Sequence, residues 1–175
     1  MRSTCEPFVE AALKEPLKRI LDAKQSCELN PTKLEKLEEV CANAEHLLSL
    51  LDAVIDSIFR SVDSCPATIR FICGCLQRSC AAKWPNDPLV RTRVVGSFIF
   101  LRLICPAIVN PRDFGLCDDT PSETAARNMI LIAKCLQVFT VIVRFHVHPP
   151  VFLLTHSLFF LLSLSLSLSL IAELG

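Results

Sequence analysis

The chain is predicted to be all-α, and three observations support this fold class. Between Leu34 and Ile58 apolar residues recur at alternating steps of three and four, the spacing of one helix face. The composition includes no Tyr and only 4 Gly, which suits helices better than a turn-rich sheet. No segment before Gln137 alternates apolar and polar residues as a strand does.

Four helical regions are expected in order. The first spans residues 8–26, where Pro16 marks either a kink or the start of a second segment. The second begins at Asn30, a capping residue, with Pro31 at the first helical position. Its stripe comprises Leu34, Leu37, Cys41, Ala44, Leu48, Leu51, Ile55 and Ile58.

The third region is expected to hold two helices joined by a loop. Pro66 opens a helix with Ile69, Ile72, Cys73 and Leu76 on one side, and residues 83–88 form the loop. Residues 94–105 are apolar except for Arg102 and too few to span a bilayer, so we expect a helix buried on most sides.

A capping box of Thr120 and Glu123 starts the fourth region. The helix that follows runs through Met129, Ile132, Ala133 and Leu136.

Charge and cysteine content narrow the class of protein. Lys and Arg number 18, as do Asp and Glu, so the net charge is zero, which argues against nucleic acid or an anionic membrane as the main partner. Residues 1–30 are too charged for a secretory signal, and the spacing of Cys73, Cys75 and Cys80 does not suit zinc. We expect reduced thiols in a cytosolic protein with no metal and no cofactor.

Arg102 raises the question of function, because a charge within an apolar helix is costly unless it is paired. Taken alone, it reads as a snorkelling or locally paired arginine. Its surroundings, FLRLICPAIVNP at residues 100–111, resemble the signature F-L-R-x-I-x-P-A-I-x-x-P of Ras GTPase-activating domains. Phe100, Pro106, Ala107 and Pro111 form the fixed frame of that motif.

The resemblance extends over residues 8–137 and favours the subtype that carries Src-homology domains. QSCEL at 25–29, KLEK at 33–36, GCLQ at 74–77, KWP at 83–85 and RTRVV at 91–95 support this subtype. The resemblance implies an all-helical domain that binds GTP-loaded Ras-type GTPases in a groove and inserts an arginine from a loop into the GTPase site. Leu101, Arg102, Lys134 and Gln137 match the groove.

Within that groove, the resemblance implies that Arg102 braces the finger loop and helps to position the catalytic glutamine of the GTPase. No finger arginine is assigned, because Arg2-Ser3-Thr4 matches the wrong segment of the family. We therefore expect a truncated start at 1–7, a partial domain at 8–137, and a chain that is nearly inactive as an activator. No nucleophile triad or phosphate loop is recognisable, so the chain is expected to be a regulator and not an enzyme.

Residues 138–175 depart from the family and are expected to be an unrelated hydrophobic tail. Ser and Leu alternate without variation from Ser163 to Leu170, as a translated CT repeat would give, so we favour a retained intron or mispredicted exon. Two alternatives remain. Val151–Ala172 carries no charge over 22 residues and could span a membrane, or the alternation could form an aggregation-prone strand.

Three functions follow from these observations: a Ras-activator fragment, a Ras-binding fragment that competes with intact activators, and a membrane-anchored helical protein without activity. The expected location is cytoplasmic, with recruitment to the inner plasma membrane. Membrane contact by the chain itself is expected only if the tail segment 151–172 is genuine.

Overall fold

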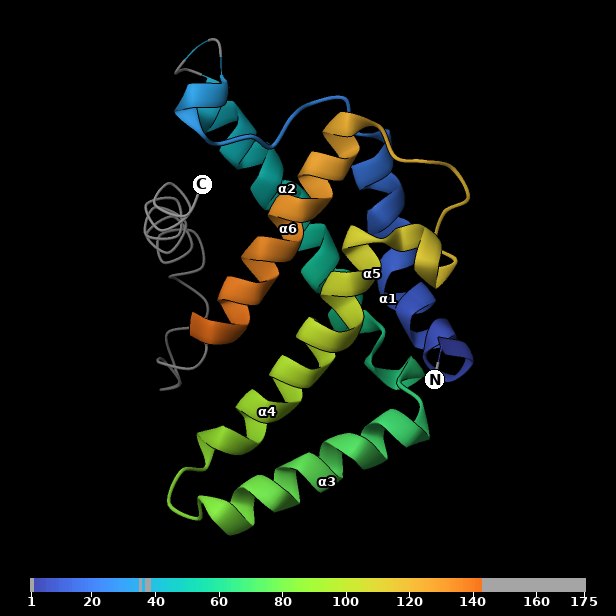
Figure 1. The fold of residues 1–175 in the computed structure, drawn as a ribbon, viewed down its shortest axis with the longest axis vertical. Helices are drawn as coiled ribbons and strands as arrows, with labels where there is room; N and C mark the ends of the chain where they lie inside the picture. Colours follow the sequence, from blue (N-terminus) through green and yellow to red (C-terminus); the bar gives the residue numbers. More distant parts are fainter. Residues whose placement is uncertain (1, 35, 37–38, 143–175) are drawn as a thin grey trace.

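The computed structural model describes residues 2–34, 36 and 39–142, and all regular structure within these residues is helical (Figure 1). The all-α prediction is therefore confirmed. The longer helices are α1 (Arg2–Asp22), α2 (Glu39–Arg60), α3 (Ala67–Lys83), α4 (Leu89–Ile99) and α6 (Glu123–Ile142). The shorter elements are η1 (Pro31–Lys33), η2 (Val62–Ser64), η3 (Phe100–Ile104), α5 (Cys105–Val109) and η4 (Pro111–Phe114).

The core lies where α1, α2, α5 and α6 meet. Each of these helices contributes an apolar face to the core. The largest fully buried side chains of the core include Leu13, Leu17, Leu51, Ile108 and Ile132. In Figure 1, α6 crosses beside α2, while α5 lies against α1. The tail predicted at 138–175 lies outside the described residues from position 143 onward, whereas α6 continues without interruption from 137 to 142.

Pro16 does not start a second segment, because α1 runs through it as one helix. A proline in a helix interior removes a hydrogen bond and costs about 3 kcal/mol. Burial of neighbouring apolar side chains such as Leu13, Leu17 and Ile20 offsets that cost, since each contributes about 1.5–3 kcal/mol.

The second helix begins later than predicted. Asn30 does act as a cap, and its Oδ1 accepts a hydrogen bond from the Thr32 amide at 3.0 Å, but it caps only the short turn η1. The chain is extended at Leu34, and α2 starts at Glu39.

The buried face of α2 is also rotated from the predicted stripe. Cys41 is exposed, Leu48 and Ile55 are half-buried, and the buried residues are Asn43, Leu47, Leu50, Leu51, Val54 and Ile58. The apolar face of this helix is wider than the predicted stripe, because Leu47, Leu50 and Val54 lie beside it. Spacing alone therefore could not select the centre of the face that α1 and α6 cover.

Helix α3 and the loop that follows agree with the prediction, but the expectation of a deeply buried helix at 94–105 is wrong for most of its length. No residue of α4 is buried, whereas Leu103, Ile104 and Cys105 are. The physical reason is visible in Figure 1: α3 and α4 form a hairpin that extends from the core. Only the C-terminal end of α4, which continues into η3, reaches the core.

Elements α4, η3 and α5 follow one another as a helical segment from Leu89 to Val109 with mean hydropathy 1.7. Among the described residues it is the one segment long and apolar enough to cross a membrane, judged by length and composition alone. A core helix passes the same test, and this segment packs against α3 and α6.

The predicted capping box at the start of α6 is wrong in its register. The side chain of Ser122, not that of Thr120, accepts the capping hydrogen bond, from the Ala125 amide at 3.2 Å. The Ser122 carbonyl accepts the first helical bond from Ala126 at 2.8 Å. The Thr120 hydroxyl instead accepts a hydrogen bond from Arg112 at 3.4 Å.

Candidate functional site: the surface around the arginine motif

The F-L-R motif lies on a single turn of π-helix, η3. The amide of Cys105 donates to the carbonyl of Phe100, five residues earlier, where an α-helix would use a residue four earlier. Pro106 follows directly, and it has no amide to offer the carbonyl of Arg102. The wider turn accommodates this missing donor, and such turns often occur at functional sites.

The π turn places Leu101 and Arg102 at the surface. Leu101 is 41% exposed and Arg102 is exposed, whereas Leu103 and Ile104, the next two residues, are buried. Within the described part of the chain the Arg102 side chain makes no hydrogen bond or ion pair. The guanidinium therefore remains in water, so its charge is not buried among the apolar neighbours.

The other two predicted groove residues lie on the adjacent helix. The thiol of Cys105 donates to the carbonyl of Ala133 at 3.7 Å, and α6 runs opposite in direction to η3 and α5 (Figure 1). Counting in opposite directions from this contact brings Arg102 level with Leu136 and Leu101 level with Gln137. Lys134 and Gln137 are both exposed. The structure thus brings all four predicted residues to neighbouring segments of two packed helices.

The frame residues of the motif are structural. Ala107 and Pro111 are buried, and Phe100 packs half-buried against the core. After Pro111 the short helix η4 ends at Gly115, whose φ of +68° favours glycine because a side chain is strained there.

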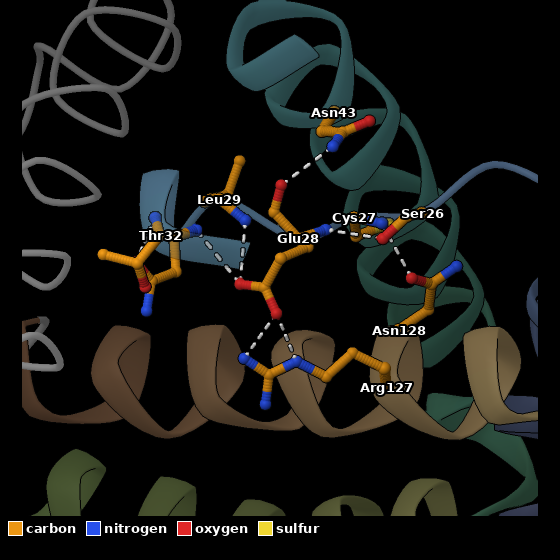
Figure 2. Close-up of polar contacts among 9 residues, drawn as sticks. Ser26, Cys27, Glu28, Leu29, Thr32, Asn43, Arg127 and Asn128 are labelled. Atoms are coloured by element: carbon orange, nitrogen blue, oxygen red, sulfur yellow. Dashed lines mark hydrogen bonds and ion pairs between the residues drawn. The ribbon is translucent and has the colours of Figure 1, made fainter. Parts of the chain in front are cut away.

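A polar network that the sequence analysis missed holds the loop between α1 and η1 against α6 (Figure 2). Asn128, which is fully buried, accepts a hydrogen bond from the Cys27 amide at 2.8 Å and donates to the Gln25 carbonyl at 3.0 Å. Asn43 of α2 donates to the Glu28 carbonyl at 2.8 Å. Because all three segments meet here, the network fixes the placement of α6, which carries Lys134 and Gln137.

Glu28 is the charged member of this network. Its Oε2 accepts a hydrogen bond from Nε of Arg127 at 2.8 Å and forms an ion pair with Nη2 of the same guanidinium at 2.8 Å. The amides of Leu29 and Asn30 donate to the other oxygen. Burial by itself raises the pKa of this carboxyl, but the hydrogen bonds and charge of Arg127 and the two amides outweigh it, so the pKa is lowered.

One signal in the sequence could have revealed this network. Asn128 occupies an apolar position of the stripe formed by Ala125, Met129 and Ile132, and a buried amide side chain requires hydrogen-bond partners. Nothing in the local sequence, however, names Glu28 as the partner of Arg127, 99 residues away.

The buried thiols are poor nucleophiles. Burial raises the pKa of Cys27 to about 12, with a contribution from the nearby Cys135, and raises the pKa of Cys105 and of Cys135 to about 11. Thiolates are the reactive form, so these cysteines act as small apolar side chains. Among the described residues no cluster of three or more His, Cys, Asp or Glu side chains could hold a metal ion.

Comparison with known proteins agrees with the motif and the helical fold. The family model described as GTPase-activator protein for Ras-like GTPase, RasGAP, matches residues 35–140. The chain therefore belongs to the RasGAP family.

Among individual proteins, the chain is similar to Ras GTPase-activating protein 1 of Homo sapiens and of Bos taurus. It is 49% identical to each over 150 residues, which cover 86% of this chain and 14% of the relative. The probable Ras GTPase-activating-like protein ngap of Dictyostelium discoideum is 39% identical over 131 residues, which cover 75% of this chain and 15% of that protein. The chain therefore spans only a small part of the length of these relatives.

Proposed function

We propose that the surface formed by η3 and α6 binds a Ras-type small GTPase in its GTP-loaded state, as part of a domain that stimulates GTP hydrolysis. The observation that carries this proposal is the π turn, which presents Leu101 and Arg102 at the surface beside the helix that carries Lys134 and Gln137. The names of the relatives, which are Ras GTPase-activating proteins, support the class of partner.

In this proposal the chain is a regulator and not an enzyme, since the nucleotide and the attacking water belong to the partner. It acts in the cytoplasm, with recruitment to the inner plasma membrane. The proposed domain occupies residues 8–137, and the segment from 138 onward lies outside it. Arg102 and Lys134 supply positive charge to the partner, and Leu101 supplies an apolar contact.

Arg102→Ala tests the binding surface. Because the side chain is exposed and unpaired within the described part of the chain, its removal should leave the free energy of unfolding unchanged. Arginines at the centre of an interface contribute roughly 2 kcal/mol or more, so affinity for GTP-loaded Ras should fall by at least about tenfold. Isothermal titration with a non-hydrolysable GTP analogue on Ras measures this.

Arg60→Ala is the control, since Arg60 is also an exposed arginine and lies at the C-terminal end of α2, outside η3 and α6. Equal affinities of the two variants would refute the proposed surface.

We propose competition with complete activators as a second function, because the family resemblance matches none of these 175 residues to a finger arginine. In the Ras system an arginine finger increases the rate of GTP hydrolysis by about 10³–10⁵-fold. This value belongs to that system and was not obtained for this chain. Single-turnover GTP hydrolysis by Ras with excess chain separates the two functions. An activator accelerates hydrolysis, whereas a competitor leaves the intrinsic rate unchanged and inhibits an added intact activator.

A further inference from the structure

The α3–α4 hairpin stands apart from the rest of the molecule in packing. α3 packs mainly against α4, and Ile69 is its one buried residue. In Figure 1 the hairpin extends from the core, and the loop between α3 and α4 forms its free end. The loop and the helix ends beside it are therefore accessible to a partner.

The hairpin also stands apart in charge. Residues 66–99 carry five basic side chains and one acidic side chain, Asp87, a net charge of +4. Because the whole chain is neutral, the remaining residues carry −4. A balanced total thus conceals a basic hairpin on an acidic body. The five basic residues are Arg70, Arg78, Lys83, Arg91 and Arg93.

Two of these five cations bond to oxygen atoms of the hairpin or of the segment before it. Arg70 donates to backbone carbonyls of the segment between α2 and α3, including that of Cys65 at 2.9 Å and that of Val62 at 3.1 Å. Arg93 forms an ion pair with Asp87 at 3.2 Å. Both therefore hold the hairpin together and contribute less to a docking surface.

The other three cations gather at the free end. Arg78 and Lys83 lie on the last turns of α3, Arg91 lies on the first turn of α4, and all three are exposed. Arg78 makes only a weak hydrogen bond to the sulfur of Cys75 at 3.2 Å.

Trp84 lies at the same end and is 47% exposed. The ammonium of Lys83 lies 4.8 Å from the centre of its ring. An exposed indole beside basic side chains suits the boundary between lipid headgroups and acyl chains, where the ring enters the apolar layer and the cations remain with phosphates.

We propose that the free end of the α3–α4 hairpin, comprising Arg78, Lys83, Trp84 and Arg91, docks on the surface of an anionic phospholipid bilayer. Charge complementarity supports this partner, since an anionic surface attracts the hairpin and repels the acidic body. The docking surface is separate from the proposed Ras-binding surface on η3 and α6, and it does not depend on the tail.

The chain provides its own reporter, because Trp84 is its single tryptophan and it has no tyrosine. The full 175-residue chain is titrated with phosphatidylcholine vesicles that contain or lack phosphatidylserine. With phosphatidylserine, the emission of Trp84 shifts to shorter wavelength as the ring leaves water. High salt reverses the shift because it screens the attraction. Vesicles without phosphatidylserine leave the emission unchanged.

The double variant Lys83→Gln, Arg91→Gln tests the cations. Each basic residue near an anionic surface contributes about fivefold to affinity, so the pair should lower vesicle affinity by an order of magnitude or more. The double variant Lys18→Gln, Arg19→Gln, which removes two exposed cations from α1, is the matched control and should bind as the unmodified chain does. Circular dichroism confirms that both variants retain their helices.

Three outcomes would overturn the proposal. An equal shift with neutral vesicles would show apolar insertion without charge recognition. Co-sedimentation with vesicles while Trp84 emission stays unchanged would assign binding to another segment, such as 151–172. No binding to either vesicle, together with binding of an acidic peptide to the hairpin, would assign the basic end to a protein partner.

Discussion

At Glu28 one carboxylate accepts hydrogen bonds from its own segment and from Arg127, 99 residues away. Arg127 of α6 donates to one oxygen, and the amides of Leu29 and Asn30 donate to the other. The residue is only 8% exposed, so removing its charge leaves Arg127 with a neutral acceptor in a poorly hydrated place.

Glu28→Gln should therefore lower the free energy of unfolding by about 2 kcal/mol, because hydrogen bonds to charged groups are worth about 1.5–3 kcal/mol. Urea denaturation followed by circular dichroism measures the loss. Glu10→Gln is the matched control, since Glu10 pairs with Lys14 at a highly exposed position of α1 and should show no measurable change.

The unmodified chain and the Glu28→Gln variant should also differ in how their stability depends on pH. The pKa of Glu28 is lowered in the folded state, so folding favours the ionised form. Its contribution is present above the unfolded-state value of 4.5 and is lost as the pH falls through the lower folded-state value. The stability difference between the unmodified chain and Glu28→Gln should be full at neutral pH and shrink below pH 4.5. A difference independent of pH would show that the charge of Glu28 is not involved.

At the scale of the element, the ends of helices were harder to predict than their existence. Both Thr120 and Ser122 are competent capping residues, and the presence of Glu123 favoured Thr120 in the sequence. The structure selects Ser122, because the Thr120 hydroxyl is bonded to Arg112 instead. Local sequence could not reveal that competing contact.

The two candidate caps of α6 can be separated by mutation. Ser122→Ala should lower the free energy of unfolding by about 1 kcal/mol, since it leaves a helical amide without its acceptor. Thr120→Ala should cost clearly less, because it removes only a 3.4 Å contact at the surface. Thermal unfolding of the two variants side by side measures the difference, and a larger loss for Thr120→Ala would contradict the observed cap.

The motif at residues 100–111 also shows that local sequence does not determine which side chains are exposed. Its sequence indicated the family, and the comparisons confirm that family. The prediction that the helix at 94–105 is buried on most sides was wrong, because no residue of α4 is buried and the π turn before Pro106 presents Leu101 and Arg102 at the surface. The roles of Leu101, Arg102, Lys134 and Gln137 in binding stay predictions.

At the scale of the whole molecule, stability should be unevenly distributed. α2 buries six side chains against α1 and α6, whereas α3 buries Ile69 and α4 buries none. Elements with few buried apolar contacts open locally at lower free energy than the core does.

We therefore expect amides of α3 to exchange with deuterium faster than those of α2 and α6, by an order of magnitude or more in native buffer. Hydrogen exchange read by mass spectrometry resolves these helices as separate peptides. Uniform protection across all three would mean that the hairpin and the core unfold as one unit.

The sequence by itself determined the all-helical class, the positions of most helices, the loop at 83–88 and the membership of a family. These properties depend on spacing, proline positions and a twelve-residue motif, all of which are local. Only the tertiary structure decided which face of α2 is buried, which residue caps α6, how Glu28 finds Arg127 and where the positive charge collects. Each of these depends on contacts between residues far apart in the chain, and a balanced total charge carries no information about how that charge is distributed in space.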